Sequence, residues 1–237
     1  MAKQISRPAR LLQASLWIYV VLIHVFAATL VWKTDFISRV RARIGHSEVH
    51  ASNPYVTSTA SFHRWVDGSV PPNSSIFFGD SITQGLATAA VSAHATNFGI
   101  SFATTRDLVN IIPKYESTQT AKTIFLAIGI NDIQAGDQSG IEERYLKILQ
   151  AFPAAAHLVW SGVMPYFRSD KGRAIKETNE IVKRLCAARQ KCTYIDTIEL
   201  LSTNGHPDPS NFLEDGIHLN TTGYSKWIAA LKAAASE

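Results

Sequence analysis

Short apolar runs alternate with amphipathic helical segments after residue 71, and this alternation restricts the possible folds more than any other feature. β-branched and aromatic residues dominate the runs, as in strands buried on both faces. The predicted strands are residues 75–78, 96–100, 122–128, 157–163 and 193–195, and the predicted helices are 104–115, 140–152, 171–189 and 222–234. The alternation predicts an α/β fold with a central parallel sheet and helices on both faces.

An uncharged run near the N-terminus predicts a transmembrane helix. Residues 11–32 contain no Asp, Glu, Lys or Arg, and at about 1.5 Å per residue they could cross a hydrocarbon core of about 30 Å. A cleaved signal peptide is a second interpretation, but the run is longer than a signal-peptide core and lacks a good cleavage site. A buried core helix is a third, but it would carry a polar stripe. We therefore expect an uncleaved, single-pass membrane anchor.

The anchor defines the expected domain organisation. A short basic tail (1–10) precedes the anchor (11–32), and a polar juxtamembrane linker (33–70) leads to one globular domain (71–237). That domain is large enough for a single hydrophobic core. Many of the basic residues that give the net charge of +4 flank the uncharged run, where they suit lipid headgroups. No basic stripe interleaved with aromatics is present, so we expect no nucleic-acid partner.

The chain has two cysteines, Cys186 and Cys192. The first should lie late on a helix and the second at the start of a strand, which allows the close approach that a disulfide needs. A disulfide would imply an oxidising compartment, whereas two buried thiols are equally compatible with the sequence. Because a short N-terminal tail before a large C-terminal domain often leaves that domain outside, we expect an extracytoplasmic domain.

Polar residues follow the predicted strands. Ser81 lies just past the end of the first strand in GDSIT, Gly99 lies near the end of the second, and Asn131 follows the third in GIND. Asp215 and His218 form DGIH before the last helix. Ligands of parallel sheets bind at the carboxyl ends of the strands, so these residues should converge. A histidine can take the proton of a serine hydroxyl, and a nearby carboxylate can orient its ring.

Each motif alone has a purely structural explanation, such as a helix cap or a turn. Their joint order resembles the SGNH (GDSL-type) hydrolase family from about residue 73 to the C-terminus. The resemblance implies a three-layer α/β/α flavodoxin-like sandwich with Ser81, Asp215 and His218 as catalytic residues. It also implies an oxyanion hole formed by the Ser81 N–H, the Gly99 N–H and the Asn131 side chain. One departure is Phe102, where family members often have a second glycine.

The resulting hypothesis is a membrane-anchored serine esterase that forms an acyl-enzyme on Ser81, with an acetylated glycan or a lipid ester as substrate. An O-acetyltransferase with the same catalytic residues and a catalytically idle tethered binding module are the alternatives. No metal-binding or nucleotide-binding motif is found, so we expect no cofactor and no metal. The sequence leaves the oligomeric state open. Aromatic residues that could line an apolar substrate pocket are Phe98, Phe102, Trp160 and Phe167.

Overall fold

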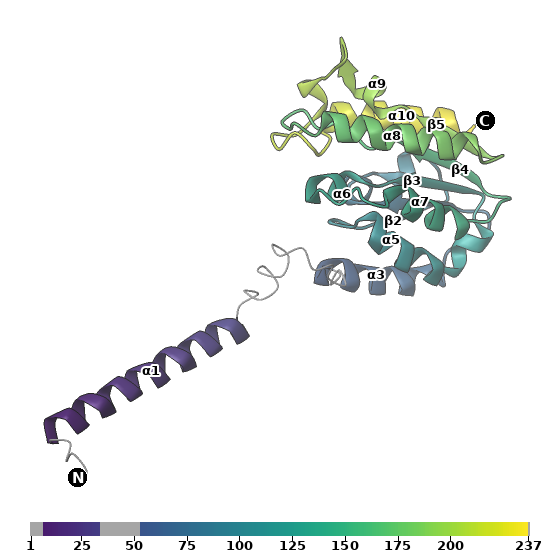
Figure 1. The fold of residues 1–237 in the computed structure, drawn as a ribbon. Helices are drawn as coiled ribbons and strands as arrows, with labels where there is room; N and C mark the ends of the chain where they lie inside the picture. The colour runs from purple at the N-terminus through teal and green to yellow at the C-terminus, as the bar shows by residue number, and fades with distance from the viewer. Residues whose placement is uncertain (1–6, 34–52, 237) are drawn as a thin grey trace. The chain divides into compact units, whose positions relative to one another are not determined.

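The computed structural model describes residues 7–33 and 53–236, which belong to two compact units (Figure 1). The first unit, Met1–Ala51, contains helix α1 (Arg7–Lys33), and the second unit is Ser52–Glu237. None of the helices among the described residues combines the length and apolarity needed to span a membrane. The membrane anchor predicted at 11–32 therefore stays a prediction, and half of the predicted linker, residues 34–52, lies outside the described residues.

A five-stranded parallel sheet forms the centre of the second unit (Figure 1). Its strands are β1 (Ser75–Gly79), β2 (Ala95–Gly99), β3 (Thr123–Ala127), β4 (His157–Ser161) and β5 (Cys192–Ile195). The order β2-β1-β3-β4-β5 is the flavodoxin-like order, and it confirms the predicted parallel sheet. Because the chain leaves β1 toward β2 and then crosses back to β3, a topological switch point lies between β1 and β3. Ligands of such sheets bind beside that point.

Helices account for most of the remaining chain. They are α3 (Pro54–Asp67), α4 (Ser81–Gln84), α5 (Thr105–Ile111), α6 (Ile130–Ala135), α7 (Ile141–Gln150), α8 (Gly172–Ala187), α9 (Thr197–Leu201) and α10 (Thr221–Ala235). A small hairpin, β6 (Ser202–Thr203) and β7 (His206–Pro207), follows α9. The longer predicted helices are confirmed to within a few residues, whereas α4, α6 and α9 are too short to show a clear helical period in the sequence.

The sheet carries a separate hydrophobic core on each face, because successive strand side chains point to opposite sides. Ile76 and Phe78 of β1 belong to the core that is covered by α3, α5, α7 and α8. Phe77 belongs to the opposite core, where Trp227 and Leu231 of α10 cover the sheet. Since every residue of β1 and β3 is buried, both faces are closed, and the three-layer arrangement is confirmed.

The globular unit begins earlier than residue 71, the start predicted from the sequence, because helix α3 is part of it. Val56 is buried in the core under α3. The Asp67 carboxylate accepts hydrogen bonds from the N–H groups of Glu116 (2.7 Å) and Ser117 (3.2 Å), and from the Ser117 hydroxyl. The second unit therefore starts at Ser52. The sequence did not reveal this because few of the apolar side chains of α3 face the core.

Cys186 and Cys192 form a disulfide, which settles the alternative left open by the sequence. Cys186 lies in the last turn of α8 and Cys192 begins β5, with 5.3 Å between their Cα atoms. The bond therefore closes the short return from the helix to the edge strand of the sheet.

Candidate active site

Ser81 is the first residue of α4, at the carboxyl end of β1. Asp80 caps this short helix, because its Oδ1 accepts a hydrogen bond from the Ile82 N–H at 3.0 Å. The strand must end in glycine here: a Cβ on Gly79 would lie 2.1 Å from the Thr83 hydroxyl oxygen. The tight strand-to-helix turn therefore places the Ser81 hydroxyl at the switch point of the sheet.

The structure brings Ser81, His218 and Asp215 together from opposite ends of the domain. The Ser81 Oγ lies 2.8 Å from His218 Nε2, and His218 Nδ1 lies 2.7 Å from Asp215 Oδ2. Because a carboxylate only accepts, Nδ1 carries the proton in this arrangement, and Nε2 of the neutral ring is left to accept from the serine hydroxyl. This is the geometry that a serine nucleophile needs.

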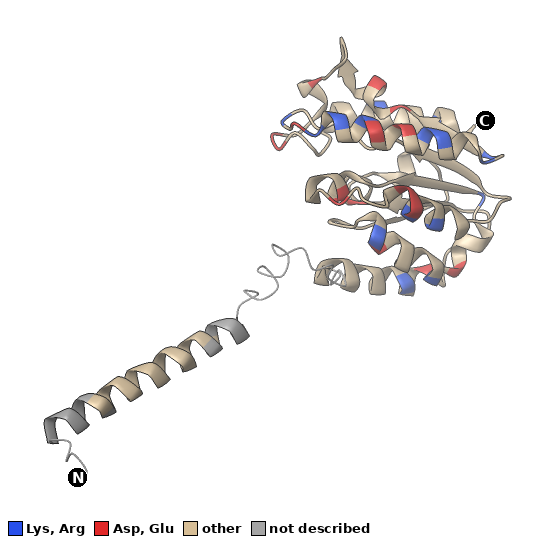
Figure 2. Cartoon of the chain, viewed as in Figure 1, with Lys and Arg blue, Asp and Glu red and all other residues tan. Residues whose placement is uncertain are grey.

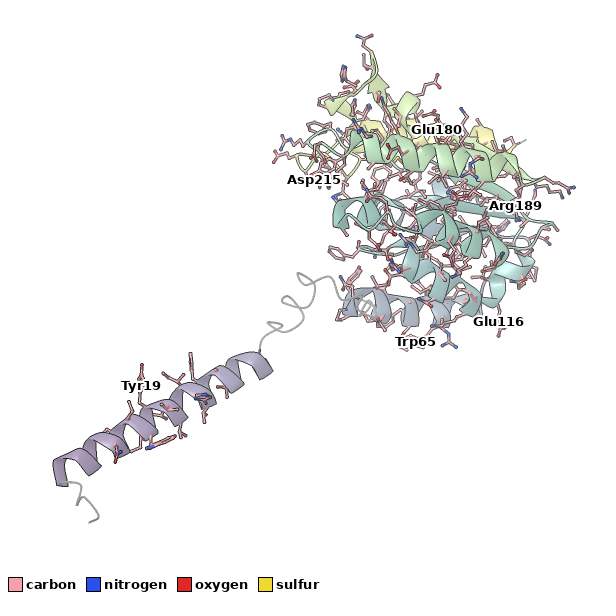
Figure 3. All side chains as sticks on the ribbon, in the orientation of Figure 1. Tyr19, Trp65, Glu116, Glu180, Arg189 and Asp215 are labelled. Carbon is pink, nitrogen blue, oxygen red and sulfur yellow. A yellow bond between two sulfur atoms is a disulfide. The ribbon has the colours of Figure 1, made fainter. Side chains whose placement is uncertain are left out.

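The loop that carries Asp215 and His218 is held by its own backbone (Figure 3 labels Asp215). Asp215 Oδ1 accepts from the N–H groups of Ile217 (2.8 Å) and His218 (2.9 Å). Gly216 between them has a φ of 76°, a conformation that glycine adopts readily. Partial burial would raise the pKa of Asp215, but these two N–H groups and the imidazole outweigh it and hold that pKa below its usual range. Asp215 is therefore ionised at neutral pH.

Asp80 differs sharply from Asp215 although both are close to His218. Burial raises the pKa of Asp80 to about 7, while the Ile82 N–H and the positive charge of His218 act in the opposite direction. Its side chain is almost completely buried, directly before Ser81 in the chain. The structure thus gives Asp80 the role of a helix cap, with a carboxyl group that titrates near neutral pH.

Asn131 lies on α6, just beyond the end of β3. Its Nδ2 donates a hydrogen bond to the carbonyl oxygen of Ala103 at 2.8 Å, which leaves the second N–H of the amide for a ligand. The neighbouring Asp132 is fully buried and holds Thr105 and Arg144, so it fixes the start of α6. Asn131 therefore has a defined position next to the segment that follows β2.

Gly99, which was predicted to be an oxyanion donor, has its N–H hydrogen-bonded within the domain. Its N–H donates to the side-chain oxygen of Asn97 at 2.9 Å, so this donor is already occupied. A Cβ at Gly99 would lie 2.4 Å from the Gln84 nitrogen. The glycine is needed because β2 packs directly against the backbone of α4, whereas the resemblance to the family had implied contact with substrate.

A second N–H near the site was not predicted from the sequence. The turn from Ile100 to Ala103 is closed by a hydrogen bond from the Ala103 N–H to the Ile100 carbonyl oxygen, at 3.1 Å. The Ser101 N–H donates to Gln84 Oε1 on α4 at 2.7 Å. Phe102 has a φ of 67°, and within the described part of the chain its N–H has no hydrogen-bond acceptor. The only sequence signal was Phe102 itself, at a position where glycine is usual in the family.

The aromatic residues considered for a substrate pocket have different locations. Phe98 and Trp160 are buried in the core, so they cannot contact a substrate. Phe102 is 61% exposed. Phe167 lines an open cavity of about 610 Å³ and donates its N–H to the carbonyl oxygen of Gly216 in the catalytic loop, at 3.2 Å. Across the described ranges, no group of three or more His, Cys, Asp or Glu residues is arranged to hold a metal ion.

Solved structures with the same fold include several ester hydrolases. A GDSL-like lipase from Bacteroides thetaiotaomicron has 15% identity and a TM-score of 0.61, covering 75% of this chain and 98% of its own. A lipase/acylhydrolase from Enterococcus faecalis has 17% identity and a TM-score of 0.59, and the match covers 69% of this chain and 96% of the acylhydrolase. An acetyl xylan esterase from Geobacillus stearothermophilus has 20% identity and a TM-score of 0.57, and the match covers 69% of this chain and 94% of the esterase. At these identities the likeness establishes the fold.

A sequence comparison establishes the family. The chain has no significant match among curated proteins. The family model of the GDSL-like lipases and acylhydrolases, in contrast, matches residues 77–226, which is more than half of the chain and includes Ser81, Asn131 and His218. The protein therefore belongs to the GDSL-like lipase/acylhydrolase family and is an ester hydrolase of this type.

Proposed function

We propose that the protein hydrolyses carboxylic esters through an acyl-enzyme on Ser81. The observation that supports this most directly is the hydrogen-bonded chain from the Ser81 hydroxyl through His218 to Asp215. His218 Nε2 takes the hydroxyl proton while Oγ attacks the ester carbonyl carbon. The tetrahedral intermediate then collapses, and the departing alcohol takes the proton from His218. Water, deprotonated by the same nitrogen, attacks the acyl-enzyme, releases the acid and returns the proton to Ser81.

The negative oxygen of the tetrahedral intermediate needs N–H donors that are in place beforehand. In this proposal the donors are the Ser81 N–H at the start of α4, the second N–H of the Asn131 amide and the N–H of Phe102. Phe102 replaces Gly99 in this role because the Gly99 N–H is occupied by Asn97. The Phe102 peptide also lies between two anchored neighbours, since Ser101 is bound to Gln84 and Ala103 to Asn131.

Two alternatives predict different products or none. An O-acetyltransferase would pass the acyl group to a sugar hydroxyl in place of water, so products formed with and without an added glycan acceptor distinguish it. An idle binding module would not need an aligned hydroxyl, imidazole and carboxylate, and the 2.8 Å and 2.7 Å contacts argue against it. Acetylated glycans and lipid esters should both be tested as substrates. The structures of similar fold include an acetyl xylan esterase, which supports testing the glycans.

For location, the proposal is an extracytoplasmic catalytic unit attached to a membrane by α1. The uncharged residues 11–32 lie within α1 (Arg7–Lys33), and basic residues flank them. The disulfide between Cys186 and Cys192 suits an oxidising compartment. Attachment would keep the catalytic unit close to the membrane surface.

Replacing Ser81 by alanine should abolish ester turnover, since Ser81 carries the one hydroxyl among the described residues that is hydrogen-bonded to the His218 ring. The free energy of unfolding should remain near that of the wild type, because the serine side chain is only partly buried. The measurements are hydrolysis of p-nitrophenyl esters, labelling by a fluorophosphonate probe, and urea unfolding. Ser225→Ala on the exposed side of α10 is a matched control that should keep both activity and labelling. Substantial turnover or labelling of Ser81→Ala would contradict the assignment.

Replacing Asn131 by alanine should lower kcat by about 10²–10³, the usual effect of losing one oxyanion donor. The Michaelis constant should change little, because the donor acts mainly on the transition state. Asn110→Ala, which removes an exposed amide from α5, serves as the control. An unchanged kcat, or a rise in KM alone, would show that Asn131 does not bind the oxyanion.

Stability should fall as pH rises from about 4 to 7, because Asp80 has a raised pKa of about 7 in the folded state. In that window the unfolded chain loses the Asp80 proton while the folded chain keeps it, so ionisation favours unfolding. Asp80→Asn can still cap α4 but cannot ionise. Relative to the wild type, the variant should gain about 3 kcal/mol in free energy of unfolding between pH 5 and pH 8. Urea unfolding at both pH values tests this, and parallel pH profiles would refute it.

The full-length protein should sediment with membranes and resist extraction by alkaline carbonate if α1 spans the bilayer. Val21→Arg combined with Phe26→Arg places charges in the uncharged run and should release the protein, because a charge at the bilayer centre costs about 3 kcal/mol. Leu146→Arg on α7 is the control and should leave the protein in the membrane fraction.

The disulfide between Cys186 and Cys192 tests the oxidising compartment. The denatured protein should react with a maleimide only after reduction. Free thiols, or release of the wild type by carbonate, would exclude this location.

A further inference from the structure

Exposed apolar side chains of the second unit gather at one place. Among its described residues, seven large hydrophobic side chains are exposed, and five of them lie on α3 or contact it. Those five are Tyr55, Phe62, Trp65, Val66 and Phe102. Leu146 and Leu213 are the remaining two. Single exposed hydrophobic residues are normal on protein surfaces, whereas a contiguous group marks a binding surface.

The exposed group follows the geometry of α3. Tyr55, Phe62 and Val66 are separated by seven and four residues, so they lie along one side of the helix. The rings of Phe62 and Trp65 pack edge to face, with 4.8 Å between their centres. Trp65 is 73% exposed and lies on the outer side of α3 (Figure 3). We call Tyr55, Phe62, Trp65 and Val66 the aromatic face of α3.

The aromatic face reaches the candidate active site through Tyr55. The Tyr55 ring contacts the Phe102 ring edge to face at 6.0 Å. The Tyr55 hydroxyl accepts a hydrogen bond from Gln84 Nε2 at 2.9 Å, and Gln84 Oε1 accepts from the N–H and the hydroxyl of Ser101. Gln84 is the last residue of α4, the helix that begins at Ser81. The exposed surface is therefore directly joined to the turn beside the nucleophile.

Phe102 is held in an unfavourable backbone conformation although its ring gains little from burial. Its φ of 67° is rare for a bulky side chain and is energetically unfavourable. A core residue could offset that cost by packing, but this ring is mostly exposed. Strain of this kind occurs at functional sites, so the exposed position of the ring calls for a partner outside the chain.

The chemistry of α3 fits a lipid surface as that partner. Arg64 is its one exposed charged residue, because Asp67 is buried. Figure 2 shows the contrast with α8, which carries both basic residues and glutamates along its length. Tyrosine and tryptophan favour the headgroup region of a bilayer, where one end of the ring is apolar and the other is hydrated. The segment between α1 and α3 can span at most about 70 Å, which would keep an anchored α3 near the membrane.

We infer that the aromatic face of α3, together with Phe102, rests in the headgroup region of a lipid bilayer and admits esters from it to Ser81. The substrate class is then an ester carried by an amphiphile that resides in the membrane. This inference rests on the proposed esterase function and adds to it the route by which the substrate arrives.

The first experiment compares two substrates of the same chemistry with the full-length protein in phosphatidylcholine vesicles. One is soluble p-nitrophenyl acetate, and the other is p-nitrophenyl palmitate dissolved in the bilayer. Phe62→Gln combined with Trp65→Gln should lower the rate on the palmitate about tenfold or more, because two interfacial rings are lost. The rate on the acetate should stay within about twofold. Leu146→Gln, an exposed apolar residue on α7, should leave both rates unchanged.

A second measurement does not depend on catalysis. Brominated lipids in the vesicles should quench a part of the tryptophan fluorescence that Trp65→Phe removes. Trp160 and Trp227 are buried and should not be quenched, and Trp17 and Trp32 of α1 are common to both proteins. Equal quenching of the wild type and Trp65→Phe would show that α3 does not touch lipid and would overturn the inference.

The remaining outcomes are also decisive. Equal losses on both substrates, or no loss on the palmitate, would overturn the inference. So would a dimer, seen by light scattering, that becomes a monomer in the double variant, because the surface would then bind a second copy of the chain. If the wild type hydrolyses neither ester, the proposed function fails, and the quenching measurement still decides whether α3 contacts the bilayer.

Discussion

The site depends on one buried carboxylate, that of Asp132. It is fully buried and accepts hydrogen bonds from the backbone N–H and the hydroxyl of Thr105, with Arg144 at 3.3 Å. These contacts tie α6 to the start of α5 and to α7 at the carboxyl end of the sheet. An ionised carboxylate in the interior is unfavourable unless it is paired and hydrogen-bonded, and removing one partner of such a pair costs about 3–5 kcal/mol. The neighbouring Asn131 therefore lies on a helix whose position is fixed by these contacts.

Two carboxylates close to His218 show how the same group acquires different properties. Asp215 lies in a partly exposed loop, where backbone N–H groups hold its pKa below the usual range. It can therefore remain ionised beside the imidazole. Asp80 is enclosed behind Ser81, and burial raises its pKa to about 7. Its first contribution is positional, since it caps α4 and so fixes the nucleophile.

The strands and the order of the chemical motifs could be predicted from the sequence because both depend on local patterns. A parallel sheet buried on both faces requires continuous apolar runs, and the polar residues follow those runs directly. The proposed oxyanion donors could not be predicted in the same way, because an N–H is available only if nothing else accepts it. The Asn97 side chain accepts the Gly99 N–H. The turn at Phe102 is held by the hydrogen bond from Ser101 to Gln84 and by the contact of the Phe102 ring with Tyr55. These are tertiary contacts that no local pattern contains.

The position of helix α3 also could not be predicted from a local sequence pattern. Its buried residues, such as Val56 and Asp67, are too few to give a strong helical pattern, while its aromatic side chains face outward. A segment with this distribution resembles a linker in sequence, yet it is part of the core and adjoins the active site. The turn beside Ser81 thus combines two requirements. In the proposed mechanism its backbone presents an N–H to the reacting oxygen, and its side chain, Phe102, extends the exposed apolar surface of α3. A glycine at this position would meet only the first requirement. Phenylalanine meets both at the expense of backbone strain, which is consistent with a substrate that approaches along an apolar surface.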